Sequence, residues 1–350
     1  MEPLDFDPTP DRLVDERGHV RFGVFNAPLP DVDVAESRFG WLGLPAPRIV
    51  RDLRLKQWQH FVLVTPELLV TLAVVDAGYL RTGWVQVVER ERRFEHARKG
   101  PRLDARVARA LWDDTTHLRA RGFEIAIANH LSAGEHRLRL AVDAGDAGPA
   151  VAGELVAHHD LARVAPLVVS LPVGTGRAMY SHKVPLPVSG ELRVGERRYA
   201  IDPTESSLIL DIHKAHYPRR TWWKWATFAG RDARGRHVGL NLTENMASAV
   251  TPRSENALWV DGRCVRLSHP TFTFDRGRIR DPWRLTTHHG EVDLSFRPAG
   301  GRAERLDLGL VRSHFDQLYG TFHGAVTLGD GTRVEVEGLR GVCEDHDARW

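Results

Sequence analysis

The feature that most constrains the fold is a long succession of short segments with strand-like alternation, separated by turn signals. Asp261-Gly262 and Asp330-Gly331 are the strongest hairpin signals, because a type I′ turn requires positive φ at both central positions. Only two segments, 102–112 and 205–216, have a pattern that fits a helix. Many strands without alternating helices predict an all-β fold rather than an α/β fold.

The length of the chain bears on its domain organisation. Its 350 residues exceed the usual size of one domain, so we expect two antiparallel β-barrel or sandwich halves with few short helices. Residues 1–50, rich in Pro, Asp and Gly, are expected to form an extended N-terminal segment. Residues 51–175 would form the first barrel-like half. Residues 176–350 would form the second half and carry the candidate pocket.

Composition excludes some classes of function. The net charge is only +2, from 48 basic and 46 acidic residues, which gives no sign of nucleic acid or an anionic membrane as a partner. The N-terminus lacks the pattern of a signal peptide, and no apolar run approaches the ~20 residues of a transmembrane helix. We therefore expect a cytoplasmic protein. Cys264 and Cys343 either pair or remain reduced, and the reduced state is the simpler expectation. The oligomeric state is left open.

Common cofactor and metal motifs are missing from the sequence. It contains no dinucleotide fingerprint, phosphate-binding loop, nucleophile elbow or H-E-x-x-H pattern. His213 and His216 have a spacing that suits a metal only on a helix, and two solvated histidines are the commoner explanation. We therefore expect neither a metal nor a cofactor.

Residues whose side chains could take part in catalysis or ligand binding concentrate between positions 180 and 256. Trp223 and Trp225 would share one face of a strand, either as ordinary core or as the aromatic wall of a ligand cavity. His182 and Asp211 are the preferred candidates for proton transfer, with Glu255 as the second carboxylate, because a Trp-lined cavity raises a carboxyl pKa by desolvation. The candidate substrate-binding residues are Lys183, Trp223, Trp225, Asn241, Glu244, Asn256, Glu344 and His346. Lys183 follows His182 directly, so the two side chains should point to opposite faces.

Several short motifs, in this order, resemble a bacterial family known as domain of unknown function 2804, over roughly residues 20–350. They are Ser181-His182-Lys183, Pro185-x-Pro187-x-Ser-Gly190, Trp223-x-Trp225, Gly239-Leu-Asn241, Glu255-Asn256 and Glu344-x-His346-x-x-x-Trp350. That family looks related to lipocalin-like double-barrel proteins, including carotenoid hydratases of the hydroxyneurosporene synthase type. The resemblance implies a calycin-like double barrel with a pocket in or between its halves.

Three hypotheses for function remain open from the sequence. The first is a cofactor-independent acid–base enzyme, such as a hydratase, dehydratase, isomerase or cyclase, acting on a hydrophobic or amphipathic small molecule. There Trp225 would shield a developing cation. The second is a non-catalytic lipocalin-like protein that binds an apolar ligand. The third is a carbohydrate-active enzyme using Asp211 and Glu255, which would then face each other across a cleft roughly 5–10 Å wide.

Overall fold

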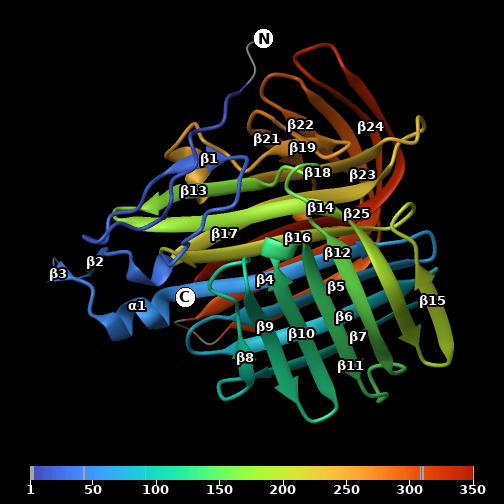
Figure 1. The fold of residues 1–350 in the computed structure, drawn as a ribbon, viewed down its shortest axis with the longest axis horizontal. Helices are drawn as coiled ribbons and strands as arrows, with labels where there is room; N and C mark the ends of the chain where they lie inside the picture. Colours follow the sequence, from blue (N-terminus) through green and yellow to red (C-terminus); the bar gives the residue numbers. More distant parts are fainter. Residues whose placement is uncertain (1–3, 42–43, 91, 308, 310, 350) are drawn as a thin grey trace.

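The computed structural model describes residues 4–41, 44–90, 92–307, 309 and 311–349. The molecule is almost entirely β, and two curled half-barrel sheets account for most of it (Figure 1). This confirms the predicted fold class. The described helices are α1 (Arg48–Arg54) and the 3-10 turns η1 (Val34–Glu36), η2 (Leu131–Ala133), η3 (Met246–Ala249) and η4 (Arg276–Arg278).

The first sheet has fourteen strands, and its main path runs β7-β6-β5-β4-β16-β14-β12-β11-β10-β9-β8. Three further strands lie off this path. Strands β13 and β15 each pair with β14, and β1 pairs with β13. The bounds are β1 (Gly23–Phe25), β4 (Leu55–Val64), β5 (Leu68–Asp76), β6 (Arg81–Glu89), β7 (Arg92–Gly100), β8 (Asp104–Arg106), β9 (Asp114–Ala120), β10 (Phe123–His130), β11 (Glu135–Val142), β12 (Val151–His158), β13 (Leu167–Gly174), β14 (Arg177–Val194), β15 (Arg197–Ile201) and β16 (Ser207–His216).

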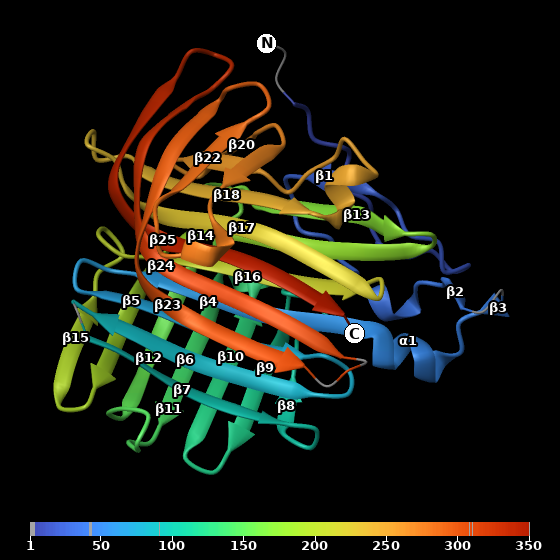
Figure 2. The same ribbon diagram turned by 180° about the vertical axis from the view of Figure 1, so that it is seen from behind.

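The second sheet has nine strands in the order β20-β19-β18-β17-β25-β24-β23-β22-β21, and its named pairs are antiparallel (Figure 2). The bounds are β17 (Arg220–Arg231), β18 (His237–Asn245), β19 (Ala257–Val260), β20 (Arg263–Arg266), β21 (Pro270–Thr273), β22 (Trp283–Thr287), β23 (Val292–Asp307), β24 (Arg312–Thr327) and β25 (Arg333–Arg349). A separate small hairpin joins β2 (Gly40–Trp41) and β3 (Leu44–Pro45).

The chain changes sheet between β16 and β17. Strands β14, β15 and β16 all pair within the first sheet, so residues 177–216 lie there. The division of the chain into folding units at residue 175 stays a prediction.

The two helix expectations were wrong. Segment 207–216 is β16, which lies between β4 and β14 and is buried at every position. A strand buried on both faces loses the alternation of polarity by which strands are recognised. Segment 102–112 contains the short strand β8 followed by irregular chain. The Asp261-Gly262 hairpin was right: both residues have positive φ, and they join β19 to β20.

Each sheet curls around a hydrophobic core of its own. The central strands also contribute side chains to a second hydrophobic cluster, which lies between the sheets. On β4, Phe61 belongs to the core of the first half-barrel, whereas Val62 packs in the cluster between the sheets. On β17, Phe228 belongs to the core of the second half-barrel, whereas Trp225 faces the first sheet. Period-two alternation therefore divides each central strand between a barrel interior and the interface.

We predict that Phe228→Ala lowers the free energy of unfolding by about 3–5 kcal/mol, because it leaves a cavity in the second core. Phe228 is fully buried and its ring lies 5.2 Å from that of Phe322. Phe22→Ala, at a position that is 39% exposed, is the matched control and should change stability by less than about 1 kcal/mol. Denaturant titration measures both, and equal losses would contradict the assignment of Phe228 to a core.

Candidate functional site

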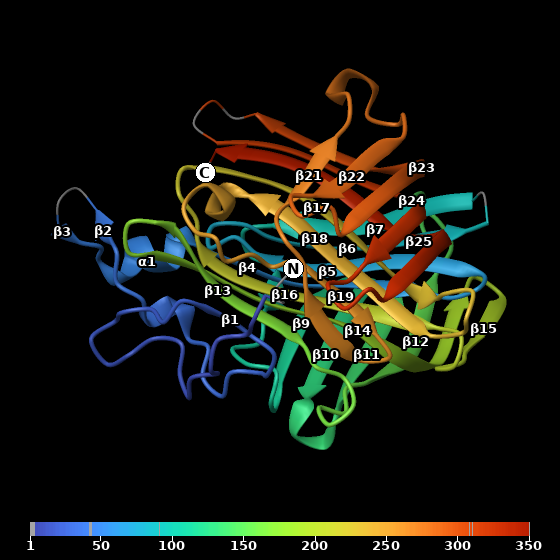
Figure 3. The same ribbon diagram turned by 90° about the horizontal axis from the view of Figure 1, so that it is seen from above.

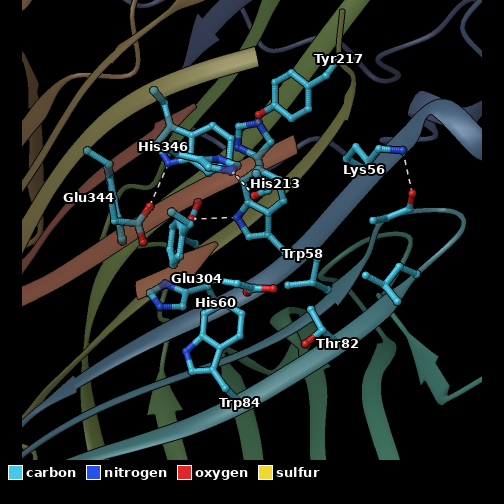
Figure 4. Close-up of a pocket in the computed structure, with 18 of the residues that line it drawn as sticks. Lys56, Trp58, His60, Thr82, Trp84, His213, Tyr217, Glu304, Glu344 and His346 are labelled. Atoms are coloured by element: carbon cyan, nitrogen blue, oxygen red, sulfur yellow. Dashed lines mark hydrogen bonds between the residues drawn. The ribbon is translucent and has the colours of Figure 1, made fainter. Parts of the chain in front are cut away.

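A cavity of about 170 Å³ lies between the two sheets (Figure 4). Strands β4, β5, β6, β7, β14 and β16 of the first sheet provide one wall, and β17, β18, β23, β24 and β25 of the second provide the other. The lining combines apolar and aromatic side chains with eight charged ones, which are Lys56, Lys99, Lys183, Asp211, Glu255, Arg302, Glu304 and Glu344. This composition is typical of a small-molecule site.

The first charged group is the buried ammonium of Lys183, held between two carboxylates. Lys183 on β14 pairs in register with Asp211 on β16, and its Nζ donates to Asp211 Oδ1 at 2.7 Å. Glu255 approaches from the second sheet, with Oε2 3.8 Å from the same Nζ. The Lys183 Nζ also lies 4.9 Å from the centre of the Trp225 ring. Trp225 therefore already stabilises a cation that belongs to the protein.

These neighbours set the charge of the three groups. Burial has the largest single effect on the pKa of Asp211 and acts to raise it, but the charge and hydrogen bond of Lys183, together with smaller effects of His213 and His60, lower the pKa overall. Burial likewise acts to lower the pKa of Lys183, yet the two carboxylates raise it. The pKa of Glu255 is raised, chiefly by burial and against the effect of Lys183. Asp211 and Lys183 are therefore an ion pair at neutral pH.

Glu344 is a second kind of carboxyl group in the same cavity. It lies on β25, where Trp223 Nε1 donates to Oε2 at 2.9 Å and Gln317 Nε2 donates to Oε1 at 2.7 Å. Burial raises the pKa of Glu344 to about 7, although the two hydrogen bonds act to lower it. A carboxyl group that titrates near neutral pH can both give and accept a proton.

Aromatic rings and neutral histidines line the space between these groups. Trp58 stacks on His213 with ring centres 4.3 Å apart, and Trp58 Nε1 donates to Asp211 Oδ2 at 3.2 Å. The Tyr217 hydroxyl and His213 Nε2 are hydrogen-bonded at 2.5 Å. Burial lowers the pKa of His60 to about 4, and those of His213 and His346 to about 3. These rings are therefore uncharged at neutral pH.

The structure brings together most of the residues predicted for the site. Those that line the cavity are Lys183, Asp211, Trp223, Trp225, Glu255, Glu344 and His346. The others lie outside the lining: His182, Asn241, Glu244 and Asn256.

The structure shows why these four side chains lie outside the cavity lining. His182 points to the opposite face of β14 from Lys183, into the first half-barrel, where its ring lies 5.8 Å from that of His159. Glu244 forms an ion pair with Lys224 at 2.9 Å. Lys224 lies on the same face of β17 as Phe228, which is the face turned toward the second core and away from the cavity.

The two asparagines lie behind the wall of the cavity. Asn241 Oδ1 accepts from Trp225 Nε1 at 2.7 Å, and Asn256 Oδ1 accepts from the backbone N–H of Thr243 at 2.6 Å. Asn241 therefore orients a ring that faces the cavity, and Asn256 provides a hydrogen-bond acceptor for a backbone N–H of a buried strand.

Several lining residues were missed from the sequence, among them Trp58, His60, His213 and Tyr217. Trp58 and His60 occupy alternate positions on β4, and this spacing was the available signal. His213 was considered only as a metal ligand on a helix. Among the described residues, no three His, Cys, Asp or Glu side chains are grouped as metal ligands. Both cysteines are buried free thiols.

Comparison with known proteins gives a family and a fold. The model of the family DUF2804, a domain of unknown function, matches residues 7–350. A crystal structure of CghA with Sch210972 superposes with a TM-score of 0.54 at 10% identity, covering 84% of this chain and 88% of that chain. A crystal structure of kievitone hydratase from Nectria haematococca covers the same shares at 11% identity, with a TM-score of 0.46. No curated protein matches the sequence. The similarity to CghA shows a shared fold.

We predict that Lys183→Met lowers the free energy of unfolding by about 3–5 kcal/mol, because it leaves Asp211 buried without its counter-charge. Adding Asp211→Asn to this variant should restore part of the loss, since the uncompensated charge is then removed. Lys224→Met, at a half-buried ion pair, is the control and should cost about 1 kcal/mol or less. Denaturant titration of the wild type, the two single variants and the double variant measures the coupling energy between Lys183 and Asp211. Additive losses in the double variant would contradict the predicted coupling.

The pKa of Glu344 gives a second prediction, on stability against pH. The unfolded chain releases this proton near pH 4.5 and the native protein near pH 7, so the native state loses stability as pH rises between these values. Relative to Glu344→Gln, the wild-type protein should lose about 3 kcal/mol over that range and nothing further above it.

Unfolding of both proteins at a series of pH values measures this difference. Glu337→Gln, on the same strand with a side chain that is 84% exposed, should show no such change with pH. A constant difference between wild type and Glu344→Gln would show that the pKa is not raised.

Proposed function

This chain belongs to the family DUF2804, and we propose that it is an acid–base enzyme acting on a hydrophobic or amphipathic small molecule in the cavity between its sheets. The observation that carries the proposal is the contrast between Glu344 and Asp211. They line one cavity, yet the pKa of Glu344 is raised to about 7 and that of Asp211 is lowered. Two carboxyl groups whose pKa values are pushed apart are the usual arrangement of an acid and a base.

The chemistry follows from these charges. Protonated Glu344 would donate to an unsaturated carbon or a carbonyl oxygen of the substrate. Asp211 or Glu255 would accept a proton from a water molecule in a hydration, or from a substrate carbon in an isomerisation or cyclisation. One proton enters and one leaves, so these reactions balance without an oxidant or reductant. The rings of Trp58 and Trp223 would face the cation that develops in between.

These roles refine the expectations from the sequence. Asp211 is ion-paired with Lys183, so it suits the part of a base rather than that of a proton donor. His182 lies outside the cavity lining, and Glu344 takes the part of the donor in its place. Asp211 and Glu255 share the Lys183 ammonium, at 2.7 and 3.8 Å, whereas a glycosidase pair holds the scissile bond of the sugar between its carboxyl groups. We therefore do not propose a carbohydrate substrate.

The experiment starts from the ligand that the protein retains. The purified chain is extracted and its ligand identified by mass spectrometry, and the recovered class of compound is then incubated with the enzyme in deuterated water. We expect product that has gained or lost one water, or that keeps its composition but carries solvent deuterium. A recovered sugar would contradict the proposed substrate class.

Glu344→Gln tests the proposed acid. Its turnover should fall about 10²–10⁴-fold, because general acid catalysis is lost, while ligand is retained. Glu337→Gln is the control on the same strand and should keep wild-type turnover. Ligand that is retained by both proteins and converted by neither would identify a carrier and overturn the enzymatic proposal.

A further inference from the structure

One end of the molecule exposes a group of large apolar side chains that nothing in the described structure covers. We call this group the apolar patch: Trp41, Leu44, Ile49, Leu53 and Tyr79. Leu44 and Ile49 are 70% and 69% exposed. The β2–β3 hairpin and α1 project together from the same end of the molecule in all three views (Figure 3). None of the residues of α1 is buried, so the helix contributes nothing to either core.

The patch is continuous with the rim of the cavity. Gly78 has a φ of +82°, and a Cβ there would lie 2.7 Å from the backbone oxygen of Asp52, so the chain beside Tyr79 packs directly against the end of α1. Lys56 ties the same elements together: its Nζ donates to the backbone oxygens of Leu53 and Ala77, both at 2.7 Å. Lys56 and Tyr79 also line the cavity.

The charges around the patch are mostly positive. Helix α1 carries Arg48, Arg51 and Arg54 against the single acid Asp52. The Arg48 side chain is 82% exposed. Arg51 instead donates to the backbone of residues 35–37, which fastens the helix to the body. The net charge of +2 for the whole chain conceals this local excess, because acids elsewhere cancel it.

We propose that the apolar patch docks on the surface of an anionic phospholipid bilayer, so that an apolar substrate enters the cavity from the lipid. Exposed Ile and Leu side chains beside a Trp and several arginines have the chemistry of an interfacial membrane anchor. Arg48, whose exposed side chain lies 3.7 Å from Asp52, would bind lipid phosphates while the apolar side chains enter the acyl boundary. The route of substrate entry rests on the proposed function, whereas docking does not.

The test is sedimentation of the full chain with vesicles of phosphatidylcholine, with and without an equal share of phosphatidylglycerol. We expect the protein to sediment with the vesicles that contain phosphatidylglycerol, and less as salt is added. Ile49→Ser combined with Leu53→Ser should weaken this binding by about tenfold or more, because two side chains no longer enter the lipid. Arg48→Glu should weaken it only for the anionic vesicles.

Matched controls replace two apolar side chains exposed elsewhere, Leu161→Ser with Val250→Ser, which are 37% and 62% exposed in the wild type. This double variant should bind vesicles as the wild type does, and circular dichroism should show both double variants folded. Wild-type protein that stays in solution with both kinds of vesicle would overturn the proposal. Loss of a dimer in Ile49→Ser with Leu53→Ser, measured by light scattering without any change in vesicle binding, would overturn it in favour of self-association.

Glu344→Gln separates this inference from the proposed function. It should bind vesicles as tightly as the wild type, because Glu344 is buried in the cavity and offers no side chain to a membrane surface. Wild-type protein that binds anionic vesicles but converts none of its retained ligand would refute the enzymatic proposal alone. An active protein that never binds them would refute docking alone.

Discussion

The central strands of this protein are buried on both faces, and this double burial positions the candidate site. One face of β4, β14 and β16 fills the first half-barrel, and the other packs toward the second sheet. Strand β17 divides in the same way between the second core and the interface. Because neighbouring side chains alternate, a polar residue on such a strand enters either a barrel interior or the interface. Lys183 and His182 show both outcomes at adjacent positions.

Within the interface, the partner of each carboxyl group decides its charge. Asp211 and Glu344 are both buried, and desolvation acts to raise the pKa of each. Asp211 lies 2.7 Å from an ammonium, so its charged form is stabilised. Among the described residues, Glu344 accepts hydrogen bonds from the neutral donors Trp223 and Gln317, which compensate its charge less completely than an ammonium would. The same cavity therefore holds a carboxylate that is charged at neutral pH, on the wall from the first sheet, and a carboxyl group with a pKa near neutral, on the wall from the second.

The sequence predicted the fold class because alternation and turn chemistry are local properties. It failed at 205–216 because that strand is buried on both faces and shows no alternation. The site was predicted in part. Trp223 and Trp225 follow from spacing on one strand, and the family motifs contain Lys183, Glu255 and Glu344.

The rest of the site depends on strand register between segments distant in sequence. Trp58 faces the cavity beside His213 because β4 pairs with β16, some 150 residues later in the chain. Gln317 reaches Glu344 because β24 pairs with β25. The pairing of β4 with β16 cannot be read from local spacing. The β24–β25 pair is indicated by the Asp330-Gly331 hairpin signal, but the register that sets Gln317 opposite Glu344 also depends on an irregularity between Phe322 and His323. The pKa of Glu344 depends on both burial and this contact.

Because its walls come from both sheets, the site requires the whole chain. Lys183 and Asp211 belong to the first sheet, whereas Glu255, Trp223 and Glu344 come from the part of the chain that builds the second. A separated first half would leave the Lys183–Asp211 pair against solvent, where an ion pair contributes little and a carboxyl group is not desolvated. A separated second half would expose Glu344, and its pKa would return toward the ordinary value. The acid and the base acquire their different properties only when the two sheets pack together and exclude water between them.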